Sequence, residues 1–279
     1  MTSGSPGRLI ILFAIPLMLG NICQQLYTMV DTMVVGQIAG VEALAALGAV
    51  DFLMWVVTGI STGLTQGFSI QLSQYYGAKN FENLRKSLAH SYRLTAFIAV
   101  GVFILSQSFA SLILTGLHTP SNIIGMSLLY LRIIFCGIPA TAAYNMFASA
   151  LRAMGNSKTP LTAMIIASVL NVSLDILFVA GFGWGVAGAA IATVIAQSFS
   201  AVYCFLILRR IDIVHLTKTD FMPASGMNAR LMKLGIPVVF QNIIIGVGGL
   251  VVQYVINGYG FLFVAGFTAC LLYTSDAAD

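Results

Sequence analysis

The stretch LIILFAIPLMLGNICQQLYTMVDTMVVG, residues 9–36, decides the class of fold because it is long and apolar enough to cross a membrane as a helix. About 20 apolar residues span the hydrocarbon core of a bilayer in helical form. The stretch also contains one carboxylate, Asp31, which is costly to bury in that setting. Together these features predict a membrane helix with a functional residue inside it.

The composition of the whole chain agrees with this prediction. Of the 279 residues, 58% are hydrophobic and 8% are charged, with a mean hydropathy of +0.94. Soluble domains carry about 25% charged residues. The formal net charge is +4, but the basic residues stand in short loops and form no aromatic-interleaved patch. We therefore expect a lipid bilayer as partner and no nucleic acid.

Seven segments are long and apolar enough to span a membrane. Of the 13 lysines and arginines, all except Arg132 fall before the first span, or in or next to the connections that alternate spans place on one side. Cytoplasmic loops are enriched in these residues, so we predict a multi-pass protein of the cell membrane with a cytoplasmic N-terminus. The predicted spans are residues 9–36, 44–74, 89–115, 122–150, 160–180, 186–208 and 231–257.

An internal repeat suggests a larger architecture. Aligning IPVVFQNIIIGVGGLVVQ (236–253) with IPLMLGNICQQLYTMVD (15–31) superposes Pro237 on Pro16 and Asn242 on Asn21. Secondary transporters are commonly built from repeated halves with the substrate site between them. The fold expected is all-α, with two six-helix lobes of which this chain holds the first and the first helix of the second. The rest of the C-terminal lobe is then a missing partner from the same polypeptide.

The predicted divisions follow from this architecture. Residues 1–208 form the N-terminal lobe, 209–230 a cytoplasmic linker, and 231–269 the start of the C-terminal lobe. The polar ending CLLYTSDAAD, residues 270–279, does not fit inside a span. We interpret it as a non-native tail at the end of a fragment.

Three acids lie inside predicted spans: Asp31, Asp51 and Asp175. Carboxylates at that depth normally face a cavity or the bundle interior and mark an ion or substrate path. For the uncharged polar residues nearby, hydrogen bonding between helices is the competing interpretation. At helical spacing, one polar face contains Asn21, Gln24, Gln25, Thr28, Asp31 and Thr32, another contains Ser168, Asn171 and Asp175, and a third contains Thr193 and Gln197.

A buried carboxyl group can bind a proton near neutral pH, or can bind Na⁺ together with amide and hydroxyl oxygens. Either makes an ion-coupling site, and we expect no cofactor and no structural metal. Asp51 is interpreted as reaching the outer interface. Arg132, the basic residue inside a span, either snorkels outward or pairs with an acid. Pro16, Pro139 and Pro237 can each kink a helix, and Pro16 is a candidate hinge.

Four stretches together resemble the multidrug and toxic compound extrusion (MATE) family, especially its bacterial NorM- and MepA-like branches. The resemblance covers about residues 8–269 and implies an antiporter of twelve helices that exports amphipathic or cationic drugs in exchange for H⁺ or Na⁺. The four stretches are IPLMLGNICQQLYTMVDTMVVGQIAGVEALAALG (15–48), GLTQGFSIQLSQYYGAKNFENLRKSLAHS (63–91), ALRAMGNSKTPL (150–161) and NVSLDILFVAGFGWGVAGAAIATVIAQ (171–197).

The resemblance also implies a cation site in the first lobe. The motif positions of the family fall here on Asp31, Tyr130, Asn171, Asp175 and Thr193. Tyr130 enters only through the resemblance, because the other four already lie on the polar faces. Na⁺, if it is the coupling ion, is expected at Asp31, Asn171, Asp175 and Thr193. The candidate residues for the pathway lining are Asn21, Gln25, Thr28 and Gln197.

Two other functions remain open from the sequence. A lipid-linked oligosaccharide flippase of the same superfamily would need a more cationic cavity than Arg132 alone provides. An intramembrane aspartyl protease would need a GxGD turn, whereas Asp175 follows NVSL. We therefore expect a transporter that works by alternating access, and not an enzyme.

Overall fold

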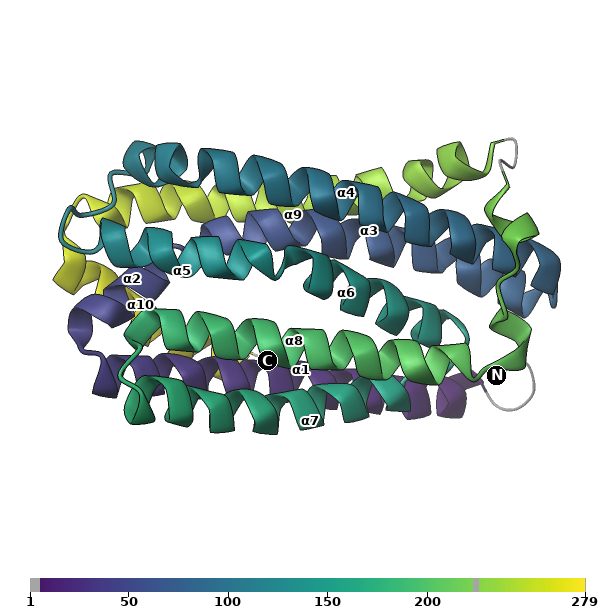
Figure 1. Ribbon diagram of the computed structural model, residues 1–279, viewed down its shortest axis with the longest axis horizontal. Coiled ribbons are helices and arrows are strands. Elements are labelled where there is room, and N and C mark those ends of the chain that lie inside the picture. Colours follow the sequence, from purple (N-terminus) through teal and green to yellow (C-terminus); the bar gives the residue numbers. More distant parts are fainter. Residues whose placement is uncertain (1–5, 223–225, 279) are drawn as a thin grey trace.

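The structure, a computed structural model, describes residues 6–222 and 226–278 and is a bundle of long helices (Figure 1). No strand occurs in these two ranges. The elements are α1 (Pro6–Ile38), α2 (Val41–Gly48), α3 (Asp51–Gly77), α4 (Phe81–Gly116), α5 (Ile124–Cys136), α6 (Ile138–Ala153), α7 (Lys158–Asp175), the π-helical turn η1 (Ile176–Gly181), α8 (Gly185–Arg209), the short 3-10 helices η2 (Asp212–Val214) and η3 (Lys218–Phe221), α9 (Met227–Asn257) and α10 (Phe261–Ala278).

The predicted membrane spans are present as helices. Over the described residues, six helical segments are long and apolar enough to cross a membrane, and the bent pair α5 and α6 makes a seventh. The outward faces are apolar as well: the side chains of Phe97 and Leu112 on α4 are 80% and 67% exposed. Such a surface is stable against lipid and not against water. The chain is therefore an all-helical, multi-pass membrane protein, as predicted.

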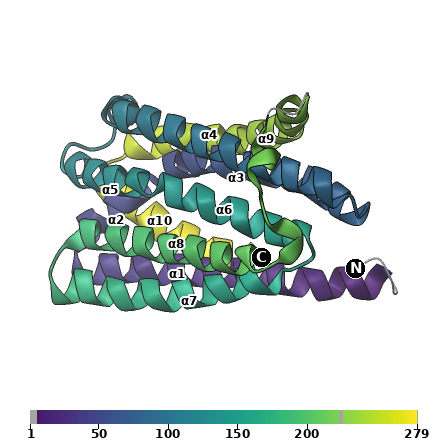
Figure 2. The ribbon, with the colours of Figure 1, turned by 45° about the vertical axis from the view of Figure 1, so that its right-hand side comes forward.

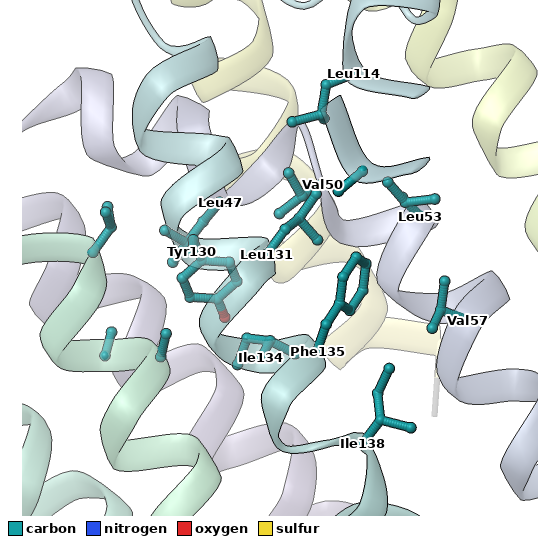
Figure 3. Close-up of a cluster of buried hydrophobic side chains, with 14 of the residues drawn as sticks. Leu47, Val50, Leu53, Val57, Leu114, Tyr130, Leu131, Ile134, Phe135 and Ile138 are labelled. Carbon is teal, nitrogen blue, oxygen red and sulfur yellow. The ribbon is translucent and has the colours of Figure 1, made fainter. Parts of the chain in front are cut away.

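The helices form two groups joined by a bent pair. On one side α3 packs against both α4 and α9, and on the other α7 packs against both α1 and α8. The pair α5 and α6 lies between the groups (Figures 1 and 2). A buried apolar cluster that includes Leu53, Leu131 and Phe135 joins α3 to α5 (Figure 3). Close packing of these side chains fixes how the two groups sit against each other.

One end of the bundle gathers the positive charge, and we call it the basic end. Helices α1, α4, α7 and α9 begin there, and α3, α6 and α8 end there (Figure 1). The spans therefore alternate in direction as the sequence predicts. The basic residues at this end, in its loops and adjoining helix turns, are Lys79, Arg85, Lys86, Arg93, Arg152, Lys158, Arg209, Arg210, Lys218, Arg230 and Lys233.

The fourth predicted span is bent. Helices α5 and α6 meet at 47°, and Pro139 in the first turn of α6 has no backbone N–H to continue the helix. At Gly137, between the helices, an added Cβ would lie 2.7 Å from Cγ2 of Val194 on α8. The kink predicted from Pro139 is present, and the absent side chain of Gly137 lets α8 approach the bend.

Two other interruptions have no counterpart in the predicted spans. The second span is divided, because α2 ends at Gly48 and α3 begins at Asp51. The fifth changes from an α-helix to a π-helical turn directly after Asp175. In that turn Phe182 donates its backbone N–H to the carbonyl of Leu177, five residues back, at 3.0 Å. Turns of this kind often occur at functional sites.

Helix α4 begins at Phe81, eight residues before the prediction, which rested on apolar residues alone. The extra turns are polar and have local partners. The Asn80 side chain accepts a hydrogen bond from the backbone N–H of Asn83 at 3.2 Å, which caps the helix. Lys86 pairs with Glu82 one turn earlier, with 2.6 Å between Nζ and Oε1. The helix therefore continues beyond its apolar part.

The predicted repeat is visible in the helices. Pro16 and Pro237 each lie inside a long helix, α1 and α9 respectively. Both helices end in a turn with a glycine at positive φ, Gly40 (φ 93) and Gly260 (φ 89), and a further helix follows. Glycine adopts this conformation without the steric cost that a side chain brings. The division into two lobes, and the interpretation of 270–279 as non-native, stay predictions; Asp279 lies outside the described residues.

Helix α9 lies directly on α3 along a line of three α3 glycines, and we call this contact the α3–α9 seam. The seam consists of Gly59, Gly63 and Gly67 of α3, which face Asn242, Val239 and Gly235 of α9 respectively. An added Cβ at Gly63 would lie 2.8 Å from the backbone nitrogen of Val239. The Asn242 side chain also donates to the carbonyl of Gly59 at 3.0 Å. Small residues in membrane helices allow this close backbone approach.

Candidate cation and substrate site

The residues predicted for the cation site come together inside the bundle. Asp31 from α1, Tyr130 from α5, and Asn171 and Asp175 from α7 are 6%, 5%, 1% and 0% exposed. Helix α7 packs between α1 and α8, and α5 packs on α8. These contacts bring the polar faces of α1, α7 and α8 towards one another, as their helical spacing predicts. Thr193 on α8 is half-buried beside them.

The contacts within this group link its members. The Asn171 side chain donates a long hydrogen bond to the Thr193 hydroxyl, with 3.4 Å between Nδ2 and Oγ1. The carboxylates of Asp31 and Asp175 interact electrostatically, and so does the Tyr130 hydroxyl with both. The Tyr130 ring itself packs among apolar side chains (Figure 3). The group is therefore acidic and enclosed.

Several oxygen atoms of the group have no donor. Oδ1 of Asp31, Oδ1 of Asn171 and both carboxylate oxygens of Asp175 are buried and make no hydrogen bond in the structure. Buried polar atoms are nearly always paired, because leaving them unpaired costs free energy. Carboxylate, amide and hydroxyl oxygens suit a hard cation, and a carboxylate can also take up a proton. This set of oxygen atoms therefore suits either H⁺ or Na⁺.

A small cavity adjoins the group, with room for about one water molecule. It lies between α1, α6, α7 and α8, and Asn171 and Thr193 belong to both the cavity and the cation group. Gln197, predicted as pathway-lining, lines it too. The other lining residues are Tyr27, Tyr144, Met164, Ala167, Ala196 and Ser200.

Tyr27 is a site residue that the sequence interpretation missed. Its hydroxyl interacts with the Gln197 side chain and with the Asp31 carboxylate. The signal was available, because Tyr27 lies one helical turn before Asp31 on the same polar face. Ser200 was missed although it continues the polar face of α8, three residues after Gln197. Tyr144 on α6 carried no comparable pattern in the sequence.

The remaining candidates on α1 lie outside the cavity lining. Asn21 is exposed, Gln25 and Thr28 are half-buried, and the Thr28 hydroxyl donates to the carbonyl of Gln24 at 3.0 Å. Pro16 stands inside an unbroken α1. Their pathway and hinge roles stay predictions.

Two charged residues within the spans lie away from the cavity. Asp51 is exposed and begins α3, and its carboxylate interacts electrostatically with the Tyr130 hydroxyl. Its interpretation as an interfacial residue stays a prediction. Arg132 is exposed, and within the described ranges no acid lies within 4.0 Å of its guanidinium. The structure thus shows no ion pair at Arg132, and snorkelling is the alternative that remains.

The fold places the chain in a known family of membrane proteins. The family model described as MatE matches residues 16–177, more than half of the chain, and the chain belongs to this family. The resemblance identified from the sequence motifs is thereby confirmed.

Individual relatives agree. The chain is 31% identical over 268 residues to the probable multidrug resistance protein YpnP of Bacillus subtilis, covering 96% of this chain and 60% of that protein. It is 22% identical to the multidrug export protein MepA of Staphylococcus saprophyticus, covering 91% and 57%. The chain thus spans about 60% of the length of these relatives.

Solved structures show the same fold. An outward-facing multidrug resistance MATE family transporter superposes with a TM-score of 0.87 at 25% identity, covering 98% of this chain and 61% of that one. An inward-facing conformation of such a transporter gives 0.82 at 23% identity, covering 92% and 60%.

Proposed function

We propose that this chain belongs to a cation-coupled exporter that moves amphipathic or cationic drugs out of the cell in exchange for H⁺ or Na⁺. Family membership supports the class of transporter, and the multidrug resistance and export names of its relatives support drugs as substrates. The basic end faces the cytoplasm in this proposal, as the distribution of lysine and arginine predicts. Transport proceeds by alternating access between the two predicted lobes.

The observation that carries the proposal is the pair of buried carboxylates, Asp31 and Asp175, with three oxygen atoms lacking donors. With the site empty, two like charges in an enclosed space destabilise the packing of α1 on α7. A proton or Na⁺ relieves this repulsion. Each positive charge that crosses the full membrane potential inward releases about 2.3 kcal/mol per 100 mV. Occupancy of the site can therefore drive a change in how α1 packs.

The cation group and the cavity share two residues, Asn171 and Thr193. If Asn171 turns its side-chain oxygen towards a bound cation, its hydrogen bond to Thr193 and the shape of the cavity wall change together. In this structure the cavity holds about one water molecule, so in this proposal the helices around it move apart to admit a drug, and drug and cation then exclude each other through these shared side chains. Such mutual exclusion is the requirement for exchange.

The test uses the full-length transporter in proteoliposomes, with efflux of a fluorescent organic cation driven by either an imposed Na⁺ gradient or a pH gradient. We expect Asp31→Asn and Asp175→Asn each to abolish driven efflux. Ser173→Ala is the matched control, because Ser173 is an exposed residue of α7 whose hydroxyl bonds only its own helix at the carbonyl of Val169. Wild-type efflux in Asp31→Asn would refute the proposal, and the gradient that drives efflux names the ion.

A further inference from the structure

At the basic end, polar side chains of the first lobe hold the linker and the start of α9. His90 on α4 is 2% exposed. Its Nδ1 lies 2.7 Å from the side-chain oxygen of Asn228 in the first turn of α9, and its Nε2 lies 3.1 Å from the backbone carbonyl of Met222 in the linker. One imidazole on α4 therefore holds two segments that lie more than 130 residues further along the chain.

The contact with Met222 determines that one nitrogen of the His90 ring carries a hydrogen. A backbone carbonyl can only accept a hydrogen bond, so Nε2 carries a hydrogen. At Nδ1, an imidazolium donates to the Asn228 oxygen, whereas a neutral ring accepts from the Asn228 amide once that amide is turned over. Both protonation states keep both contacts. The junction is therefore independent of the charge on His90.

The linker itself is folded against α4. Asp220 accepts hydrogen bonds from the backbone N–H and the hydroxyl of Thr217, both at 2.8 Å, which closes a capping box. Arg93 donates to the carbonyl of Phe221 at 3.1 Å, and Arg85 lies 3.9 Å from Asp220. Residues 217–221 of the linker therefore have a defined fold and defined contacts with α4.

The first turn of α9 makes two more polar contacts, both with α3. Gln71 reaches the sulfur of Met227 at 3.0 Å, and Arg230 donates to the Tyr75 hydroxyl at 3.2 Å. All these contacts lie at one end of the pathway that the two predicted lobes enclose. They must break if α9 moves away from α3 and α4 at that end.

We propose that His90 is a positioning residue that latches the start of α9 and the linker to α4, and so holds the basic end of the transporter closed in one of its two states. The inference rests on the proposed function, because only an alternating-access transporter needs such an end to open. His90 touches neither drug nor cation in this role. It sets the balance between the closed and open forms.

The balance can be measured as a distance in the full-length transporter. Spin labels at Lys158→Cys on α7 and Ala229→Cys on α9, both exposed at the basic end, report separation of the two helices once the native cysteines are replaced. We expect His90→Ala to raise the ratio of the long-distance to the short-distance population about fivefold, the effect of one hydrogen bond removed. Ser91→Ala, at a neighbouring buried hydroxyl with no partner, should leave the ratio unchanged.

Two conservative variants separate a latch from simple packing. Asparagine at position 90 places a polar atom where Nδ1 lies and keeps the contact with Asn228, whereas glutamine places its amide nitrogen where Nε2 lies and keeps the contact with Met222. We expect His90→Asn to retain the closed population and His90→Gln to lose it. Asn228→Ala should match His90→Ala, and the double variant should add nothing further.

Equal populations in His90→Ala and Ser91→Ala would overturn the latch, and so would identical shifts in His90→Asn and His90→Gln, which indicate packing alone. These outcomes are read from distances and need no transport. A wild-type protein that exports no drug would instead refute the proposed function. The two failures are therefore distinguishable.

Discussion

Replacing Gly67 with alanine should be among the most damaging single-methyl changes in this protein. An added Cβ at Gly67 would lie 2.6 Å from the backbone nitrogen of Gly235 and 2.7 Å from the carbonyl oxygen of Leu234. Ordinary contacts of a Cβ begin at 3.4 Å, and Cα of Gly235 lies closer still than these two atoms, so α9 must retreat by about 1 Å. Backbone atoms cannot rotate aside as a side chain can. The change should therefore open the α3–α9 seam along several turns.

The magnitude follows from the packing that such a gap weakens between α3 and α9. A gap of 0.5–1 Å forfeits about a quarter to a half of the dispersion energy of each atom pair, and overpacking of this kind costs about 1–3 kcal/mol. We expect the apparent melting temperature of the purified full-length protein in detergent to fall by about 5 °C, measured by intrinsic fluorescence.

The matched control is Gly101→Ala on α4, where nothing lies within 4 Å of an added Cβ. There alanine removes glycine's backbone entropy and should raise stability by about 0.5 kcal/mol. If Gly67→Ala melts within a degree of Gly101→Ala, then α9 does not sit on α3 as the structure shows, and the seam argument fails.

Three smaller predictions concern single positions. Gly137→Ala should lower the melting temperature, and Val194→Ala in the same protein should restore it, because the added Cβ comes closest to the end of the Val194 side chain. Asp51→Asn should leave driven efflux at the wild-type rate; loss of efflux would assign Asp51 to the cation path. Asn80→Ala should cost about 1 kcal/mol and speed hydrogen exchange at the Asn83 amide, since the cap is removed.

The membrane spans were predictable because each is a long and mainly apolar segment, whereas the breaks within the second and fifth of them were not. The sixth predicted span, 186–208, differs from α8 (Gly185–Arg209) by one residue at each end. The polar faces were predictable from helical spacing, which placed Asp31 and Asp175 on faces that meet. The high free-energy cost of a carboxylate in lipid then indicated that these two aspartates have a function.

What the sequence did not reveal depends on contacts between distant segments. The π-helical turn after Asp175 has an apolar sequence, ILFVAG, that fits a regular helix equally well. The pairing of His90 with Asn228 joins residues 138 positions apart, and no local pattern marks either of them. Gly59, Gly63 and Gly67 form a repeat of small residues, but only the structure shows that α9 is what they contact.

The α3–α9 seam also indicates that the linker is not needed to keep α9 attached to the folded protein. The segment between Arg210 and Thr217 joins α8 to α9 in sequence, yet α9 is held by backbone-to-backbone contact with α3 and by its polar first turn. A protease that nicks the folded protein after Arg210, which is exposed, should therefore release nothing. The two pieces should elute as one particle and separate only on a denaturing gel, so the covalent bond is dispensable once folding is complete.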